Sequence, residues 1–133
     1  MSKIEKGFIA VGYQDKENVR PALDVISNVL FQHGMTPVLC VDDLQMEDPE
    51  VSMKQVLETV VQCDLLIVEG SRKRIGVGIE AGVAYSHGKI IIYTHERDVE
   101  VSKTLRGISD YEIIYGSPEH LHTQLDQLLS ALI

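Results

Sequence analysis

The feature that most constrains the fold is one stretch, residues 64–89, which reads DLLIVEGSRKRIGVGIEAGVAYSHGK. It opens with the apolar run Leu65–Val68, which is long enough for a strand and too short for a helix. A polar loop over Gly70–Arg74 follows, and the chain is then apolar again up to His87 and Gly88, where a glycine can end a helix. The stretch therefore predicts a buried strand, an exit loop and a helix over Gly76–His87.

The predicted helix carries three glycines, Gly76, Gly78 and Gly82, around a single acid, Glu80. Each glycine costs a helix roughly 1 kcal/mol relative to alanine, so we expect close approach by a neighbouring element or a ligand. Glu80 follows the carboxyl end of a buried strand, where open α/β sheets bind their ligands. It is the first candidate for chemistry, although the helix dipole also favours an acid near a helix start without any function.

Strands and helices alternate along the whole chain. We expect strands at Gly7–Tyr13, Thr36–Val41, Leu65–Val68, Ile90–Thr94 and Tyr111–Tyr115. Between them we expect helices around Leu23–Gly34, Val51–Cys63 and Gly76–His87, a short helix around Val101–Arg106, and a last helix that begins at Ser117 and Pro118. The last helix has a seam of leucines that faces either the sheet or a partner subunit: Leu121, Leu125, Leu128 and Leu132.

This alternation predicts a single α/β domain over residues 1–133 with a doubly wound, flavodoxin- or Rossmann-like parallel sheet of five strands. The commonest strand order at this size is 2-1-3-4-5, with a switch point between the first and third strands. That order brings Tyr13, at the end of the first strand, and Glu80, after the third, to one crevice.

Composition limits the possible partners. The formal net charge of −8 argues against binding to nucleic acid or to an anionic membrane, because either would be repelled. The two cysteines, Cys40 and Cys63, lie in apolar stretches and are expected to be buried free thiols of a reducing compartment. No metal-ligand spacing, signal region or membrane span is visible, so we expect a cytoplasmic protein without metal or cofactor. The histidines, including His33 and His95, are expected at the surface or at helix caps.

Within residues 64–89, the runs D-L-L-I-V-E, G-V-G-I-E-A-G-V-A-Y and G-K-I-I-I resemble the nucleoside 2-deoxyribosyltransferase superfamily, and most closely its 2′-deoxynucleoside 5′-monophosphate N-glycosidases. In that family the glutamate of G-x-G-x-E is the nucleophile that attacks the anomeric carbon. The resemblance therefore implies this role for Glu80. It likewise implies that Tyr13 orients the nucleophile, although a tyrosine at a strand end is also a common packing residue.

Other site residues follow from charge and from the same resemblance. Ser71 and the cations Arg72, Lys73 and Arg74, next to a helix N-terminus, could bind a phosphate or could simply be a solvated loop. The segment S-x-x-L-R-G at Ser102 resembles the part of the family whose serine reaches the phosphate of a neighbouring subunit, which implies at least a homodimer. Together these arguments assign substrate binding to Gly12, Ser71, Arg74, Gly76, Gly78 and Ser102.

The sequence departs from the family at two places. The loop Gln14–Glu17 replaces a loop rich in serine and glycine, and Val56 stands where family members have a second carboxylate that assists the leaving base. Glu58 lies about 200° further round the helix and cannot simply replace it. The loop acids Asp15, Asp42 and Asp43 are conceivable replacements.

Two functions therefore remain open. The first is N-glycosidic cleavage of, or deoxyribosyl transfer from, a nucleoside 5′-monophosphate through Glu80. The second is a non-catalytic protein that binds or senses a nucleotide, because loss of general acid assistance typically costs roughly 100- to 10,000-fold in rate.

Overall fold

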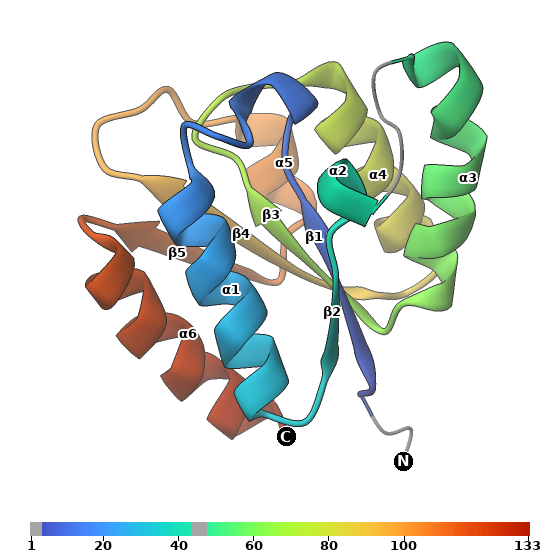
Figure 1. Cartoon of the computed structure of the whole chain (residues 1–133). Helices are drawn as coiled ribbons and strands as arrows, with labels where there is room; N and C mark the ends of the chain where they lie inside the picture. The colour runs from blue at the N-terminus through green and yellow to red at the C-terminus, as the bar shows by residue number, and fades with distance from the viewer. Residues whose placement is uncertain (1–3, 44–47) are drawn as a thin grey trace.

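The computed structural model describes residues 4–43 and 48–133 and contains one parallel sheet of five strands (Figure 1). The strand order is β2-β1-β3-β4-β5, which confirms the predicted order 2-1-3-4-5. The strands are β1 (Lys6–Ala10), β2 (Thr36–Val38), β3 (Leu65–Glu69), β4 (Ile90–Glu96) and β5 (Tyr111–Tyr115). In the pairing of the two central strands, Gly7 lies opposite Leu65 and Ala10 opposite Val68.

Helices cover both faces of the sheet, as expected for a doubly wound fold. One face carries α1 (Arg20–Gln32) and α6 (Pro118–Leu132), which pack on each other. The other face carries α3 (Pro49–Gln62), α4 (Ile75–Ser86) and α5 (Lys103–Ile108), with α4 packed between its two neighbours. Two short helices, η1 (Tyr13–Asp15) and α2 (Cys40–Asp43), follow β1 and β2. No helix in residues 4–43 or 48–133 is long and apolar enough to cross a membrane.

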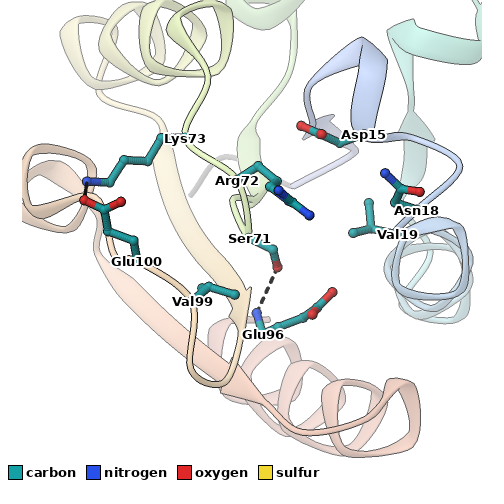
Figure 2. Close-up of a pocket in the computed structure, with 9 residues that line it drawn as sticks. All are labelled: Asp15, Asn18, Val19, Ser71, Arg72, Lys73, Glu96, Val99 and Glu100. Carbon is teal, nitrogen blue, oxygen red and sulfur yellow. Dashed lines mark hydrogen bonds and ion pairs between the residues drawn. The ribbon is translucent and has the colours of Figure 1, made fainter.

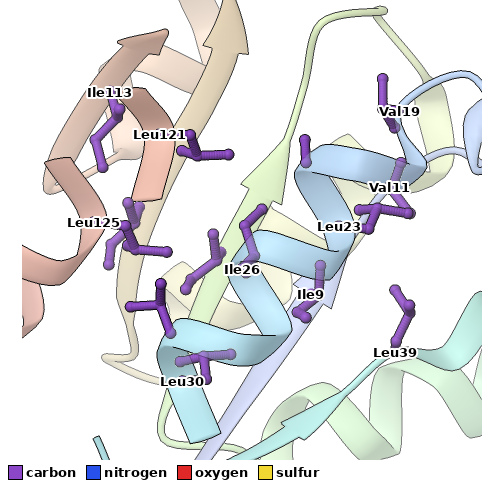
Figure 3. Packing of buried hydrophobic residues seen from close by; sticks show 14 of the residues in the cluster. Ile9, Val11, Val19, Leu23, Ile26, Leu30, Leu39, Ile113, Leu121 and Leu125 are labelled. Atoms are coloured by element: carbon purple, nitrogen blue, oxygen red, sulfur yellow. The ribbon is translucent and has the colours of Figure 1, made fainter. Parts of the chain in front are cut away.

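The core has two layers, one on each side of the sheet. Figure 3 shows the layer beneath α1 and α6, a single cluster to which Ile9, Leu23 and Leu125 belong. In α6, Leu121 and Leu125 are fully buried, so the leucine seam faces the sheet, the first of the two predicted alternatives. The seam continues through Leu129 rather than Leu128, which is partly exposed. The second layer joins residues of β1, β3 and β4 to α3 and α4.

The structure differs from the sequence expectation at the ends of the first two strands. β1 ends at Ala10, and Tyr13 belongs to η1 rather than to the strand. β2 ends at Val38, and Cys40–Asp43 forms α2, which begins where the backbone N–H of Leu39 donates to Asp43 Oδ2 at 3.3 Å. Both side chains of the apolar pair Cys40 and Val41 are buried in this helix, so burial alone could not distinguish a strand from a helical turn. Residues 44–47, between the expected second strand and the next helix, lie outside the described residues.

Candidate active site

Glu80 lies in the buried stripe of α4, one turn after Gly76. The side chain is only 6% exposed, and a methyl group built on Gly76 would lie 3.9 Å from Glu80 Oε2. The carboxyl group therefore points back toward the start of α4, as long helical side chains generally do. This start follows the carboxyl end of β3, the edge where parallel sheets bind their ligands.

Burial raises the pKa of Glu80 from 4.5 to about 8. The direction of this shift shows that burial outweighs the stabilisation that a helix N-terminus can give to a carboxylate. Glu80 is the sixth residue of α4, whereas the dipole acts mainly within the first turn. At neutral pH the buried carboxyl group is mostly protonated, and a cationic centre next to it would be needed to stabilise the carboxylate.

Val56, which stands at the position of the missing second acid, is surrounded by apolar residues in the structure. Val56 is fully buried in α3 and packs in one cluster with Val77 and Ala81, which flank Glu80 along α4. Cys40 of α2 lies in the same cluster, and burial raises the pKa of its thiol to about 12, with a further contribution from the nearby Glu80. The surroundings of Glu80 in the described chain are therefore mainly apolar.

The three loop acids that could replace this carboxylate all have other partners. Asp42 Oδ2 and Oδ1 accept from Arg20 at 2.7 and 3.0 Å, and this guanidinium lowers the pKa of Asp42. Asp43 caps α2, and Asp15 binds Arg74. Glu58 is exposed on α3. None of them is held at Glu80 in this conformation of the described chain.

Tyr13 packs on the other side of the sheet. Its ring is partly buried against the cluster beneath α1 and α6, and Lys16 Nζ lies 4.4 Å from the ring centroid. The residues that flank Glu80 belong to the opposite cluster. The structure thus does not bring the Tyr13 ring to the Glu80 side, and the orienting role of Tyr13 stays a prediction.

Arg74 and Asp15 form a bidentate ion pair across the switch point between β1 and β3. Arg74 Nε donates to Asp15 Oδ2 and Arg74 Nη2 to Asp15 Oδ1, both at 2.8 Å. A methyl group on Gly12 would lie 2.8 Å from Arg74 Cγ and 2.6 Å from Asp15 Oδ2. The Arg74 side chain therefore lies directly against the backbone at Gly12, a residue predicted to bind substrate.

A cavity of about 480 Å³ contains three of the predicted binding residues: Arg74, Gly78 and Ser102. Nothing lies within 4 Å of a methyl group built on Gly78, so the space next to this glycine is open to a ligand. The Ser102 hydroxyl accepts from the backbone N–H of Leu105 at 3.2 Å and thereby caps α5. Ser102 and Arg74 of one chain thus line one cavity, and a role of Ser102 at the phosphate of a neighbouring subunit stays a prediction.

The glycines of α4 do not serve close packing inside the described chain. Methyl groups on Gly78 and Gly82 would meet nothing within 4 Å, and one on Gly76 would meet only Glu80. Of the two expected alternatives, close approach by a neighbouring element is not found at Gly78 or Gly82 within the described residues. The other alternative, approach by a ligand, fits Gly78, because this glycine lines the cavity.

A second cavity, of about 530 Å³, lies on the other side of the loop that follows β3. Figure 2 shows the Arg72 guanidinium directed into it, whereas Lys73 turns away to Glu100, with Nζ 2.8 Å from Oε1. Among the three loop cations, only Arg72 has no carboxylate partner in the described chain. The predicted anion site therefore has two of its three charges already neutralised.

Ser71 serves the structure of this loop. Its backbone N–H donates to Glu69 Oε1 at 2.9 Å and its hydroxyl to Glu69 Oε2 at 2.8 Å, while Ser71 Oγ accepts from the N–H of Glu96 at 2.9 Å. The Tyr115 hydroxyl also donates to Glu69 Oε2. Burial raises the pKa of Glu69, and both burial and this carboxylate raise that of Tyr115. Ser71 still lines the second cavity, where a ligand could reach it.

Sequence reasoning missed several buried polar groups, among them Glu69 and His95. Glu69 ends the apolar run of β3, and an acid at the end of a buried strand was the one signal available. His95 is buried, not at the surface or a helix cap, and its Nε2 lies 2.8 Å from Glu112 Oε2. Arg106 also binds Glu112 and lowers the pKa of this carboxyl group to about 2.

In residues 4–43 and 48–133, no group of three His, Cys, Asp or Glu side chains could hold a metal ion.

Comparison with solved structures finds the same fold in several proteins. A CMP N-glycosidase from Clostridium botulinum superposes with a TM-score of 0.70 at 23% identity, over 92% of this chain and 99% of that one. A conserved protein from Enterococcus faecalis V583 gives a TM-score of 0.72 at 16% identity, over 95% and 99% of the two chains. The NanR protein of Vibrio vulnificus, solved with ManNAc-6P, gives 0.60 at 16% identity and matches 97% of this chain but 48% of its own.

No family model matches the chain. No curated protein is significantly similar to it in sequence. At the identities found, the likeness to solved structures is one of fold.

Proposed function

We propose that the chain is a member of the nucleoside 2-deoxyribosyltransferase superfamily that cleaves the N-glycosidic bond of a nucleoside 5′-monophosphate, or transfers its deoxyribosyl group, with Glu80 as the nucleophile. The observation that carries this proposal is the buried carboxyl group of Glu80, directed toward the carboxyl edge of the central strands. The fold likeness to a CMP N-glycosidase supports it and agrees with the resemblance of residues 64–89.

In the proposed reaction, a Glu80 carboxylate oxygen forms a bond to the anomeric carbon as the bond from that carbon to the base nitrogen breaks. The base leaves with the electron pair of that bond and takes up one proton. Water, or a second base, then attacks the glycosyl ester and releases Glu80. The transition state resembles an oxocarbenium ion, and its positive charge would stabilise a carboxylate whose pKa is otherwise raised to about 8.

The phosphate would occupy the cavity that Arg74, Gly78 and Ser102 share. There it would meet a guanidinium, a serine hydroxyl and the start of α4, a combination suited to an anion. Gly76, in the first turn of α4, would let the sugar approach the backbone there, and Gly12, after β1, would do so once the Arg74 side chain moves. No metal or cofactor takes part in this proposal.

We also propose that the working unit is a homodimer or a larger homo-oligomer. Support comes from the outer face of α4, where Ile75, Ile79 and Tyr85 are 86%, 45% and 61% exposed. Ile75 also lines the cavity of Arg74 and Ser102, so a subunit docked on this face would border the site. Light scattering of the wild type and of Ile79→Lys tests it, since a monomeric wild type would contradict the proposal.

The two free thiols, both buried, support residence in a reducing compartment such as the cytoplasm. Cell fractionation tests this, and recovery outside the cytoplasm would contradict it.

The decisive experiment follows release of free base by chromatography. Purified protein is incubated with ribo- and deoxyribonucleoside 5′-monophosphates of all bases, including CMP and dCMP, and with the matching nucleosides. We expect base release from a monophosphate, and loss of this release in Glu80→Ala and Glu80→Gln. Glu58→Ala, which removes an exposed acid from α3, is the matched control and should keep the activity. Base release that persists without Glu80 would exclude the proposed nucleophile.

The second candidate is a nucleotide-binding or sensing protein without turnover. It is favoured by one observation, the fully buried Val56 at the position of the second carboxylate. This candidate predicts heat of binding with one nucleotide in calorimetry and no base release over days. A glycosidase rate well above that of Glu80→Ala would rule it out.

A further inference from the structure

The Arg74–Asp15 pair joins two segments that are far apart in sequence and closes the space beside Gly12. Asp15 is almost fully buried, whereas the Arg74 side chain is 33% exposed. Asp15 lines the cavity of about 530 Å³ and Arg74 the cavity of about 480 Å³, so the pair lies on the boundary between the two. Two charge-assisted hydrogen bonds with this geometry hold a guanidinium in one orientation.

The stem of Arg74 occupies the place that a ligand would need at the end of β1. A methyl group on Gly12 would lie 2.8 Å from Arg74 Cγ and 3.4 Å from Arg74 Cδ. A ligand that approaches the Gly12 backbone must therefore move this side chain. Moving it means breaking both hydrogen bonds to Asp15.

While the pair remains, the charge of Arg74 is not free for a ligand anion, and Arg72, which lines both cavities, is the loop cation without a carboxylate partner in the described chain. Asp15 neutralises Arg74, and Lys73 is already bound to Glu100. A phosphate placed on Arg74 beside the Asp15 carboxylate would set two anions against one guanidinium, which is unfavourable at short range. If the phosphate replaces Asp15, Arg74 again has one bidentate anionic partner.

We propose that Asp15 competes with the ligand's phosphate for Arg74, so that binding exchanges the Arg74–Asp15 pair for an Arg74–phosphate pair. The proposal rests on the phosphate-binding part of the proposed function. In the exchange, the hydrogen bonds from Nε and Nη2 pass from the carboxylate to phosphate oxygens, and Asp15 is released at the switch point.

The test measures the dissociation constant of inorganic phosphate by calorimetry for the wild type, Asp15→Asn, Arg74→Gln and the double variant. Asparagine keeps the shape of Asp15 and removes its charge. We expect Asp15→Asn to bind phosphate about tenfold more tightly, because the bidentate carboxylate that competes for Arg74 is lost. We expect Arg74→Gln to bind it more weakly, and Asp15→Asn to have no effect when Arg74 is absent.

The matched control is Glu17→Gln, two residues from Asp15, which removes the same charge from an exposed acid that pairs with Arg20. It should change phosphate affinity less than twofold, because exposed charges are screened. If Asp15→Asn does not fold by circular dichroism, Asp15→Ser removes the charge with a smaller side chain.

Equal or weaker phosphate binding in the charge-removing variant would overturn the proposal and would make Asp15 a support for Arg74. Absence of phosphate binding in both the wild type and this variant would overturn it as well. Failure of the proposed glycosidase is a separate result, because phosphate binding is measured without any nucleotide and does not involve Glu80.

Discussion

Gly12 and Arg74 lie in such close contact that any side chain at position 12 would displace the arginine, because a β-carbon there would lie 2.8 Å from Arg74 Cγ. We expect Gly12→Ala to destabilise the protein by about 1–3 kcal/mol, the usual cost of forcing extra atoms into a packed site. The backbone at Gly12 is extended, so the cost is steric and not conformational. Urea unfolding measures it, and an unchanged midpoint would show that the Arg74–Asp15 pair is looser than described.

Gly78→Ala and Gly82→Ala are expected to have the opposite effect on stability. Both glycines lie inside α4 with free space around them, so each substitution should stabilise the fold by about 0.5–1 kcal/mol. Only Gly78 lines the cavity assigned to phosphate. Gly78→Ala should therefore weaken phosphate binding while Gly82→Ala should not, and equal affinities in calorimetry would remove Gly78 from the binding site.

The raised pKa of Glu80 predicts how stability depends on pH. The folded state keeps the proton up to about pH 8, whereas the unfolded chain releases it near pH 4.5. Stability should therefore fall as the pH rises between these values, by an amount of the order of 5 kcal/mol at most, and then level off. The Glu80→Gln variant should lack this fall. Urea unfolding of both proteins from pH 4 to 9 measures it, and parallel curves would contradict a raised pKa.

The same pKa sets the expected pH dependence of base release. A nucleophile must be ionised, so kcat/KM should rise with pH and level off near pH 8 in the free enzyme. A rate that instead falls over this range would mean that Glu80 acts as a proton donor. Initial rates on the preferred monophosphate, measured in buffers of constant ionic strength, distinguish the two roles.

Tyr115→Phe tests the buried network that holds the loop after β3. The substitution removes the hydroxyl that donates to Glu69 and leaves the two bonds from Ser71 in place. We expect a loss of about 1–3 kcal/mol, because a buried carboxyl group loses one donor. Tyr85→Phe, at a tyrosine that is 61% exposed, is the control and should change stability by less than about 0.5 kcal/mol. Equal unfolding midpoints for Tyr115→Phe and Tyr85→Phe would contradict a stabilising role of the Tyr115–Glu69 hydrogen bond.

The sheet could be predicted from the sequence because each buried strand is a short apolar run between turn signals, as Leu65–Val68 shows. The burial of Glu80 on α4 could not, because the acid replaces an apolar residue in the helical repeat and its depth depends on α2 and α3. The Arg74–Asp15 pair could not be predicted from the sequence either. It joins residues 59 positions apart, and the lone charges gave no sign that they would meet.

The two buried thiols, Cys40 and Cys63, can be used to report on opening of the core around Glu80. Cys40 and Cys63 are enclosed, and burial raises their pKa values to about 12 and 11, so both should resist alkylating reagents in the native state. Cys40 lies in the same cluster as the residues around Glu80. The rate at which a maleimide dye labels Cys40 therefore measures how often the packing around Glu80 opens, and a ligand that stabilises this packing will slow the labelling even where no turnover occurs.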